Sequence, residues 1–203
     1  MSEPGTSGDG TVAFLHEAGY LKHLPRTGWQ IIGVPQPESV AEHSYRVGLI
    51  AFVLATLEGA NADRAAVLGL LHDLPECRIG DVPLLGKPHV TTRDAVEVIG
   101  LQTEAVAEPA RAALRAAVAE YEGRDTAEAR CAKDADRIEC LLQAREYGAR
   151  GNPLVQPWVD SCLAGVTTDA GRRLAAAARE TDPNDWWRLA RAPVSAARRP
   201  PGR

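Results

Sequence analysis

Leu70-Leu71-His72-Asp73-Leu74-Pro75-Glu76-Cys77-Arg78-Ile79-Gly80-Asp81 is the most informative stretch of this chain. An apolar helical run ends here on an adjacent histidine and aspartate, His72 and Asp73, and two more carboxylates, Glu76 and Asp81, follow within eight residues. Burying such ionisable groups without partners would destabilise the fold. A metal ion is the simplest partner that satisfies a histidine and an aspartate together. The stretch therefore predicts a metal site whose other ligands lie elsewhere in the chain.

The composition is that of an ordinary soluble globular protein. The chain has 203 residues, 45% hydrophobic and 25% charged, a length that fits one domain. Its net charge of -4 argues against general binding to nucleic acid or to a membrane surface. No apolar run reaches the roughly 18 residues that span a bilayer, and the first ten residues do not resemble a signal peptide. We therefore expect neither a nucleic-acid partner nor a membrane partner.

The cysteine pattern indicates a reducing compartment. Cys77, Cys131, Cys140 and Cys162 are widely spaced, and no C-x-x-C pair occurs among them. Such spacing is not that of a disulfide framework or a zinc ribbon. We therefore expect reduced thiols and a cytoplasmic protein.

Hydrophobic periodicity predicts an all-α fold. Ser39 and Glu42 have the spacing of a capping box before a helix that runs to Gly59, and Asn61 can cap the next one, which ends at Leu74-Pro75. A long amphipathic helix is expected over 126–147. Further helices are expected over residues 11–24, 91–106, 109–123, 158–164, 168–180 and 184–191. No alternating β pattern competes with this reading.

One domain is expected, between a disordered start and a loose end. Arg26 to Trp29 and residues 77–90 are expected to be loops because proline and glycine interrupt the periodicity around them. The expected organisation is a disordered segment 1–10, a domain over 11–192 with its core motifs in 26–150, and a basic proline-rich tail over 193–203.

Polar residues interrupt the apolar faces of three expected helices. They are His43 in the first turn of one helix, His72 and Asp73 at the end of the next, and Asp136 on the long helix. Two histidines and two carboxylates make a mixed nitrogen and oxygen site. That donor set suits Mn, Fe, Co, Ni or Zn better than Ca or Mg, which prefer oxygen alone.

Each of these residues also has an ordinary structural interpretation. A lone histidine such as His43 is more often a core or surface residue, and Asp136 beside Arg137 resembles a surface ion pair. Loop charges such as Lys87 and His89 are as readily solvated as functional. The conjunction favours a site: a histidine, then a His-Asp pair about 30 residues on, then an aspartate about 60 further, each on an expected helix.

The order H…HD…D resembles that of the HD-domain metal-dependent phosphohydrolases. Four segments are similar to the branch that contains the 5'-deoxynucleotidases and their eukaryotic HD-domain-containing relatives, and the resemblance covers roughly residues 12–150. The four segments are 26–29, 37–43, 71–81 and 133–136. The pattern H-D-x-x-E-x-x-x-G-D is the most specific part. The resemblance implies a single HD-domain helical bundle with the metal site between core helices.

The resemblance also implies roles for individual residues. His43, His72, Asp73 and Asp136 would bind one divalent transition metal, which could be Co, Mn, Fe, Ni or Zn. Glu76 would orient or deprotonate the attacking water, and Asp81 would assist proton transfer to the leaving 5'-oxygen. A divalent ion fits this chemistry because it neutralises phosphate charge and acidifies water.

Two residues near the start of the domain would bind the substrate. By the same resemblance, Arg26 would bind the phosphate, whose oxygens a guanidinium can fork, and Trp29 would pack near the sugar and disfavour a 2'-hydroxyl. Two residues separate Arg26 from Trp29 here, whereas bacterial members have the pair adjacent. Without the resemblance, Arg26 is equally a surface residue and Trp29 a core ring.

The expected activity is metal-dependent hydrolysis of nucleoside 5'-monophosphates, preferably 2'-deoxy or otherwise non-ribo, by a homodimer. The alternatives are another HD phosphohydrolase or phosphodiesterase, a di-iron oxygenase, and a non-catalytic nucleotide-binding protein. Two-metal enzymes need further ligands between the His-Asp pair and the last aspartate. His89 is the one histidine in that interval, which favours one metal.

Overall fold

The protein is a helical bundle, seen in a computed structural model that describes residues 7–197. Within that range there is no strand, and the single isolated β-bridge joins Pro25 to Ser39. The all-α prediction is confirmed. The helices are α1 Ser7–Ala18, η1 Gly19–Lys22, α2 Thr27–Ile31, α3 Val40–Glu58, α4 Ala62–Leu71, α5 Glu76–Ile79, η2 Lys87–His89, α6 Ala95–Gln102, α7 Ala110–Gly123, α8 Ala127–Ala149, η3 Pro153–Val155, α9 Gln156–Gly165, α10 Asp169–Glu180 and α11 Asp185–Ala197.

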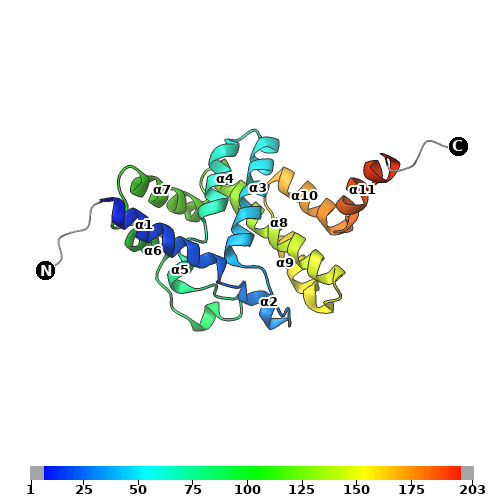
Figure 1. The fold of residues 1–203 in the computed structure, drawn as a ribbon, viewed down its shortest axis with the longest axis horizontal. Coiled ribbons are helices and arrows are strands. Elements are labelled where there is room, and N and C mark those ends of the chain that lie inside the picture. The colour runs from blue at the N-terminus through cyan, green and yellow to red at the C-terminus, as the bar shows by residue number, and fades with distance from the viewer. Residues whose placement is uncertain (1–6, 198–203) are drawn as a thin grey trace.

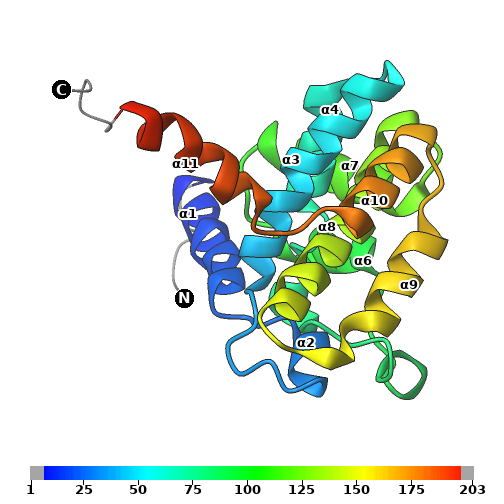
Figure 2. The same ribbon diagram turned by 90° about the vertical axis from the view of Figure 1, so that its right-hand side faces the viewer.

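Helices α3 and α8 form the centre of the bundle. Both views place them between α1 on one side and α9 and α10 on the other (Figures 1 and 2). Helix α4 lies very close to α3 because glycines meet at the contact. A Cβ at Gly69 would lie 3.2 Å from Gly48 Cα, and a Cβ at Gly48 would lie 3.2 Å from the carbonyl oxygen of Ala66. This close packing brings the C-terminal end of α4 near the first turn of α3.

The sequence signals at the ends of these central helices are confirmed. Ser39 and Glu42 form both hydrogen bonds of the capping box at the start of α3, and Gly59 ends the helix with φ of 72°. Asn61 accepts a hydrogen bond from the backbone of Arg64 at the start of α4, and Thr126 caps α8 in the same way.

The buried apolar side chains form two clusters. The larger joins α3, α4 and α8 to the C-terminal helices α9 and α10. The smaller packs η1 and α1 against α6 and α7, and includes Phe14, Leu21, Ile99 and Val118. Leu74, directly before Pro75, belongs to the smaller cluster, and Leu71 at the end of α4 packs against both, so the turn after α4 lies where the two clusters meet.

Asp134 is a buried carboxylate on α8 whose role is structural. Its side chain is fully buried and accepts hydrogen bonds from the backbone nitrogens of Thr167 and Thr168, at 3.0 and 2.7 Å. Arg137, which the sequence suggested as a partner for Asp136, pairs instead with Asp134 at 3.5 Å. Asp134 therefore anchors the start of α10 to α8.

Three expectations for the N-terminal half are wrong. Residues 7–10, expected to be disordered, form the start of α1, and the rest of 1–10 lies outside the described residues. The segment from Arg26 to Trp29, expected to be a loop, is the start of α2, because Thr27 is bonded to a distant carboxylate. The expected loop 77–90 begins inside α5.

Two helix boundaries also differ. The expected helix 91–106 is shorter, because Asp94 caps it and α6 spans Ala95–Gln102. The tail from Pro193, expected to be loose, continues α11 to Ala197. Residues 198–203 of that tail lie outside the described residues.

One helix of the described range, α3, is long and apolar enough to cross a membrane by length and composition. A central core helix passes the same test. Half of the qualifying window is buried inside the bundle, as expected for a core helix.

Candidate metal centre

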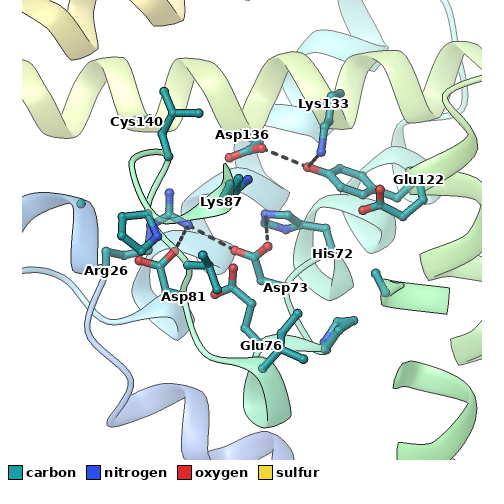
Figure 3. A pocket seen from close by; sticks show the side chains of 18 of the residues that line it. Arg26, His72, Asp73, Glu76, Asp81, Lys87, Glu122, Lys133, Asp136 and Cys140 are labelled. Carbon is teal, nitrogen blue, oxygen red and sulfur yellow. Dashed lines mark hydrogen bonds and ion pairs between the residues drawn. The ribbon is translucent and has the colours of Figure 1, made fainter. Parts of the chain in front are cut away.

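A cavity of about 430 Å³ lies beneath α8, between α7 and the segment that runs from α2 to the loop after α5. Figure 3 shows its polar side chains converging from both sides, with Asp136 and Lys133 from α8 facing Asp73, Glu76 and Asp81. Predicted site residues in its wall are Arg26, Trp29, His72, Asp73, Glu76, Asp81 and Asp136. The tertiary fold thus gathers these residues from widely separated parts of the chain.

The two histidines and two aspartates of the predicted ligand set meet at one point. His43 Nε2 lies 3.3 Å from Asp136 Oδ1 and 3.7 Å from Asp73 Oδ2. His72 Nε2 lies 3.1 Å from Asp73 Oδ1. Ligand atoms of His43, His72 and Asp73 all lie within 4.8 Å of one another. Side chains this close can coordinate one ion between them.

The hydrogen bonds of the two imidazole rings leave both Nε2 atoms available. His72 Nδ1 lies 2.7 Å from the carbonyl oxygen of Gly69, which can only accept, so Nδ1 carries the proton. His43 Nδ1 faces the Glu139 carboxylate in the same way. Both Nε2 atoms are buried and make no hydrogen bond to any part of the chain between residues 7 and 197. Buried ring nitrogens that lie beside carboxylates, on imidazoles held through Nδ1, fit a divalent transition metal.

The charges of the centre also fit a bound metal cation. Burial lowers the pKa of His43, but the Glu139 and Asp136 carboxylates outweigh it and raise this pKa to about 10. Burial raises the pKa of Asp73, but His72, His43 and Arg26 outweigh it and bring it to about 2. The ionised carboxylates therefore attract a positive charge at His43 Nε2. A metal cation bound there would replace that proton.

Arg26 supplies the positive charge on the open side of the centre. Its NH1 group lies 3.4 Å from Asp73 Oδ2 and 3.7 Å from Asp81 Oδ1. Burial disfavours the charged guanidinium, but the facing carboxylates keep the pKa of Arg26 well above its ordinary value. Asp81 also accepts hydrogen bonds from the backbone nitrogen and the hydroxyl of Thr27. Asp81 therefore holds the first turn of α2, and with it Arg26, against the site.

Glu76 points into the cavity from the first turn of α5. Its Oε2 atom is buried and accepts no hydrogen bond within the described range of the chain. Burial and the neighbouring Asp73 and Asp81 carboxylates raise the pKa of Glu76 to about 9. Its carboxyl group can therefore hold a proton at neutral pH, and a nearby cation would favour the ionised form.

The support around the ligands was not apparent from the sequence. Glu139 is fully buried and holds His43 Nδ1, and Arg46 Nε donates to Glu139 at 2.9 Å. Tyr121 donates its hydroxyl to Asp136 Oδ2 at 3.1 Å and accepts from Lys133. A polar residue three positions after Asp136, on an otherwise apolar face of α8, is the one sequence signal that could have identified Glu139.

We expect Glu139→Gln to weaken metal binding 10- to 100-fold, the usual effect of losing the carboxylate partner of a ligating histidine. The measurement is isothermal titration of the metal-free protein with Mn²⁺ or Co²⁺. Glu146→Gln is the matched control, because Glu146 also pairs with Arg46 but does not contact His43. Unchanged affinity in Glu139→Gln would contradict the role of Glu139.

Trp29 lies at the wall of the cavity rather than inside it. It is 2% exposed, its Nε1 donates to Glu38 Oε1 at 3.0 Å, and its ring packs on Tyr147 and Trp158. Lys87 lines the cavity, whereas His89 is exposed in η2 and does not. Trp29 is therefore a buried ring with little surface open to a ligand.

Comparison with known proteins agrees with the resemblance expected from the motifs. Residues 18–177 match the HD domain family. The chain is 38% identical over 146 residues to 5'-deoxynucleotidase HDDC2 of Mus musculus, covering 70% of this chain and 71% of that protein. It is 30% identical over 203 residues to the Danio rerio protein of the same name, covering 90% and 99%.

A solved structure extends this agreement to the fold. The predicted metal-dependent phosphohydrolase from Magnetospirillum magnetotacticum superposes with a TM-score of 0.65 and 28% identity, covering 88% of this chain and 92% of that one. The family match spans α3, α5 and α8, which carry His43, Glu76 and Asp136, and the turn between α4 and α5 that carries His72 and Asp73. The chain belongs to the HD domain family.

Proposed function

We propose that this protein is a metal-dependent phosphomonoesterase that hydrolyses nucleoside 5'-monophosphates, with a preference for sugars that lack a ribo 2'-hydroxyl. The observation that carries the proposal is the pair of buried, unpartnered Nε2 atoms of His43 and His72 beside the carboxylates of Asp73 and Asp136. The name 5'-deoxynucleotidase, borne by relatives at 30–38% identity, supports the substrate class.

The proposed ligands of the metal are His43, His72, Asp73 and Asp136. When bound there, one divalent ion would neutralise phosphate charge and acidify water, as divalent ions generally do. Its identity among Co, Mn, Fe, Ni and Zn stays open. The exposed position of His89 in η2 supports a count of one metal per chain.

The other polar residues of the cavity have distinct proposed tasks. Arg26 binds two phosphate oxygens through its guanidinium, which its neighbouring carboxylates keep charged. Glu76 accepts the proton of the attacking water, within reach because it shares the cavity with Asp73. Asp81 lies beside Arg26 and assists proton transfer to the leaving 5'-oxygen.

Sugar selection is proposed for the wall that contains Trp29. The indole is fixed by its hydrogen bond to Glu38 and by ring contacts with Tyr147 and Trp158. A rigid wall cannot move aside for an extra hydroxyl group, so it selects by steric exclusion. A 2'-hydroxyl pressed against this wall would also lose its hydrogen bonds to water.

We expect phosphate release from dAMP, dGMP, dCMP and TMP after metal removal and addition of Mn²⁺ or Co²⁺, with slower release from the ribonucleotides. A colorimetric phosphate assay measures this directly, and chelator-treated protein without added metal is the control. Absence of phosphate release from every nucleotide with every metal would contradict the proposed function.

A homodimer in the cytoplasm is proposed as the working form. One side of α3 leaves apolar side chains exposed at helical spacing, namely Tyr45, Leu49, Phe52, Val53 and Leu57. A contiguous apolar face of this kind is typical of a protein–protein interface. Light scattering should give twice the mass of one chain, and Leu49→Glu combined with Leu57→Glu should give one.

A further inference from the structure

A second cavity, of about 410 Å³, adjoins the metal centre. Its wall shares Gly28, Pro83, Leu84, Cys140 and Trp158 with the wall of the first cavity. A ligand in the first cavity can therefore extend into the second without crossing the protein. No sequence motif pointed to this space.

The two cavities differ sharply in chemistry. The first is lined by the charged groups of the metal centre, whereas the second is lined almost entirely by apolar groups from α2, the loop after α5, and α9. Ser161 is the one hydroxyl side chain in the described wall, beside the thiols of Cys140 and Cys162. A ligand that fits both must be charged at one end and flat or apolar at the other.

Trp158, in α9, is the large aromatic side chain at the junction. It is partly exposed, and its ring packs on Trp29 with centroids 5.6 Å apart and planes 31° apart. A Cβ at Gly28 would lie 3.6 Å from Trp158 Nε1, so the indole faces α2 at the position where Gly28 has no side chain. These contacts fix Trp158 from behind and leave it lining both cavities.

The spacing along α8 is comparable to the separation between the phosphate and the base of a nucleotide. Asp136 lies in the metal centre, and Cys140 lies one helical turn further on, where the cavities join. Residues four apart on one helix have Cβ atoms about 5–6 Å apart. Figure 3 shows Cys140 on the side of Asp136 toward Arg26, away from Lys133. A group one sugar away from a phosphate at the metal would therefore reach the apolar cavity.

We propose that the apolar cavity binds the nucleobase and that Trp158 is the platform on which the base stacks. The exposed side chains of Leu84 and Leu85 also line this cavity. This inference rests on the proposed function, because it takes a nucleoside monophosphate as the ligand. Since the wall offers few polar side chains, recognition depends on ring area, and purines bind more tightly than pyrimidines.

The test compares the binding of two phosphonates in which a methylene group replaces the 5'-oxygen, so that neither can be hydrolysed. One is the analogue of dAMP, and the other is the analogue of 2-deoxyribose 5-phosphate, which has no base. The quantity is the ratio of their dissociation constants, measured by titration calorimetry with the Mn²⁺-loaded protein. In the wild type the dAMP analogue binds more tightly than the analogue without a base. The corresponding phosphonate analogue of dCMP, measured in the same way, has a dissociation constant between those two values.

Trp158→Leu should reduce this ratio by roughly 5- to 150-fold, the range observed for loss of one base–aromatic stack. Trp158→Phe keeps a ring and should retain most of the ratio. Trp187→Leu, on the exposed face of α11, is the control and should leave it unchanged. Circular dichroism checks that each variant is folded. If Trp158→Leu does not fold, the ratio is compared between the wild type and Trp158→Phe.

Two results would overturn the proposal: a wild-type ratio near one, or an unchanged ratio in Trp158→Leu, whether or not both ligands bind more weakly to that variant. Failure of the proposed function is a separate result. It would appear as no phosphate release from dAMP by the wild type, whatever the binding ratio.

Discussion

Asp73→Asn is expected to reduce phosphate release by on the order of 10³-fold or more, and to abolish tight metal binding. Loss of an outer partner of a metal ligand already reduces affinity 10- to 100-fold, and Asp73 contacts the site directly. Its carboxylate lies within 3.1–3.7 Å of His72, His43 and Arg26, so one substitution removes the negative charge shared by all three. Asparagine keeps the shape of the side chain.

The measurements are steady-state phosphate release and metal content by mass spectrometry after gel filtration. Asp169→Asn is the surface control, because the Asp169 side chain is 80% exposed on α10. Wild-type rates in Asp73→Asn would exclude a metal centre at this position as the source of activity. Loss of activity with full metal content would indicate instead that Asp73 acts on the substrate.

Glu76→Gln is expected to lower kcat by about 10²- to 10⁴-fold, the usual contribution of a general base, while leaving metal content intact. Glutamine has the same shape but cannot accept a proton from water. Glu122→Gln is the matched control, since Glu122 lines the same cavity from α7 and is exposed. Equal loss of metal in Glu76→Gln would show that Glu76 is a ligand rather than a base.

In the metal-free protein, Glu76→Gln should be more stable than the wild type at high pH. The pKa of Glu76 is raised from 4.5 to about 9, so between these values the folded chain holds a proton that the unfolded chain has lost. Stability therefore falls as pH rises through this window. Glu76→Gln cannot ionise, so its Tm advantage over wild type should be small at pH 5 and reach a few degrees at pH 9. An advantage that shrinks with rising pH would contradict the buried, protonated state.

The sequence by itself determined the helices and the identity of the central residues. Capping signals at Ser39, Asn61 and Thr126 are local, because each depends on a side chain and a backbone nitrogen two or three residues away. The His72-Asp73 pair is local in the same sense. The start of α6 at Ala95 was not predicted, although Asp94 caps that helix through a bond to the backbone nitrogen of Val96.

The contacts around the ligands depend on tertiary structure. Glu139 lies 96 residues from His43 in sequence, and Thr27 lies 54 residues from Asp81, so no local pattern connects them. Likewise, Trp158 comes from a segment with no recognisable motif, yet it borders the cavity that contains the proposed metal ligands His72, Asp73 and Asp136.

Residue type therefore indicated the chemistry of the chain, because the side-chain atoms of a residue determine whether it can bind a metal or accept a proton. Only the packing decided which groups meet. The close approach of α3 and α4 at Gly48 and Gly69 brings His43 to His72, and α8 lies across both with Asp136. The physical reason is that helix formation depends on neighbours in sequence, whereas the geometry of the site depends on burial of apolar surface between distant segments.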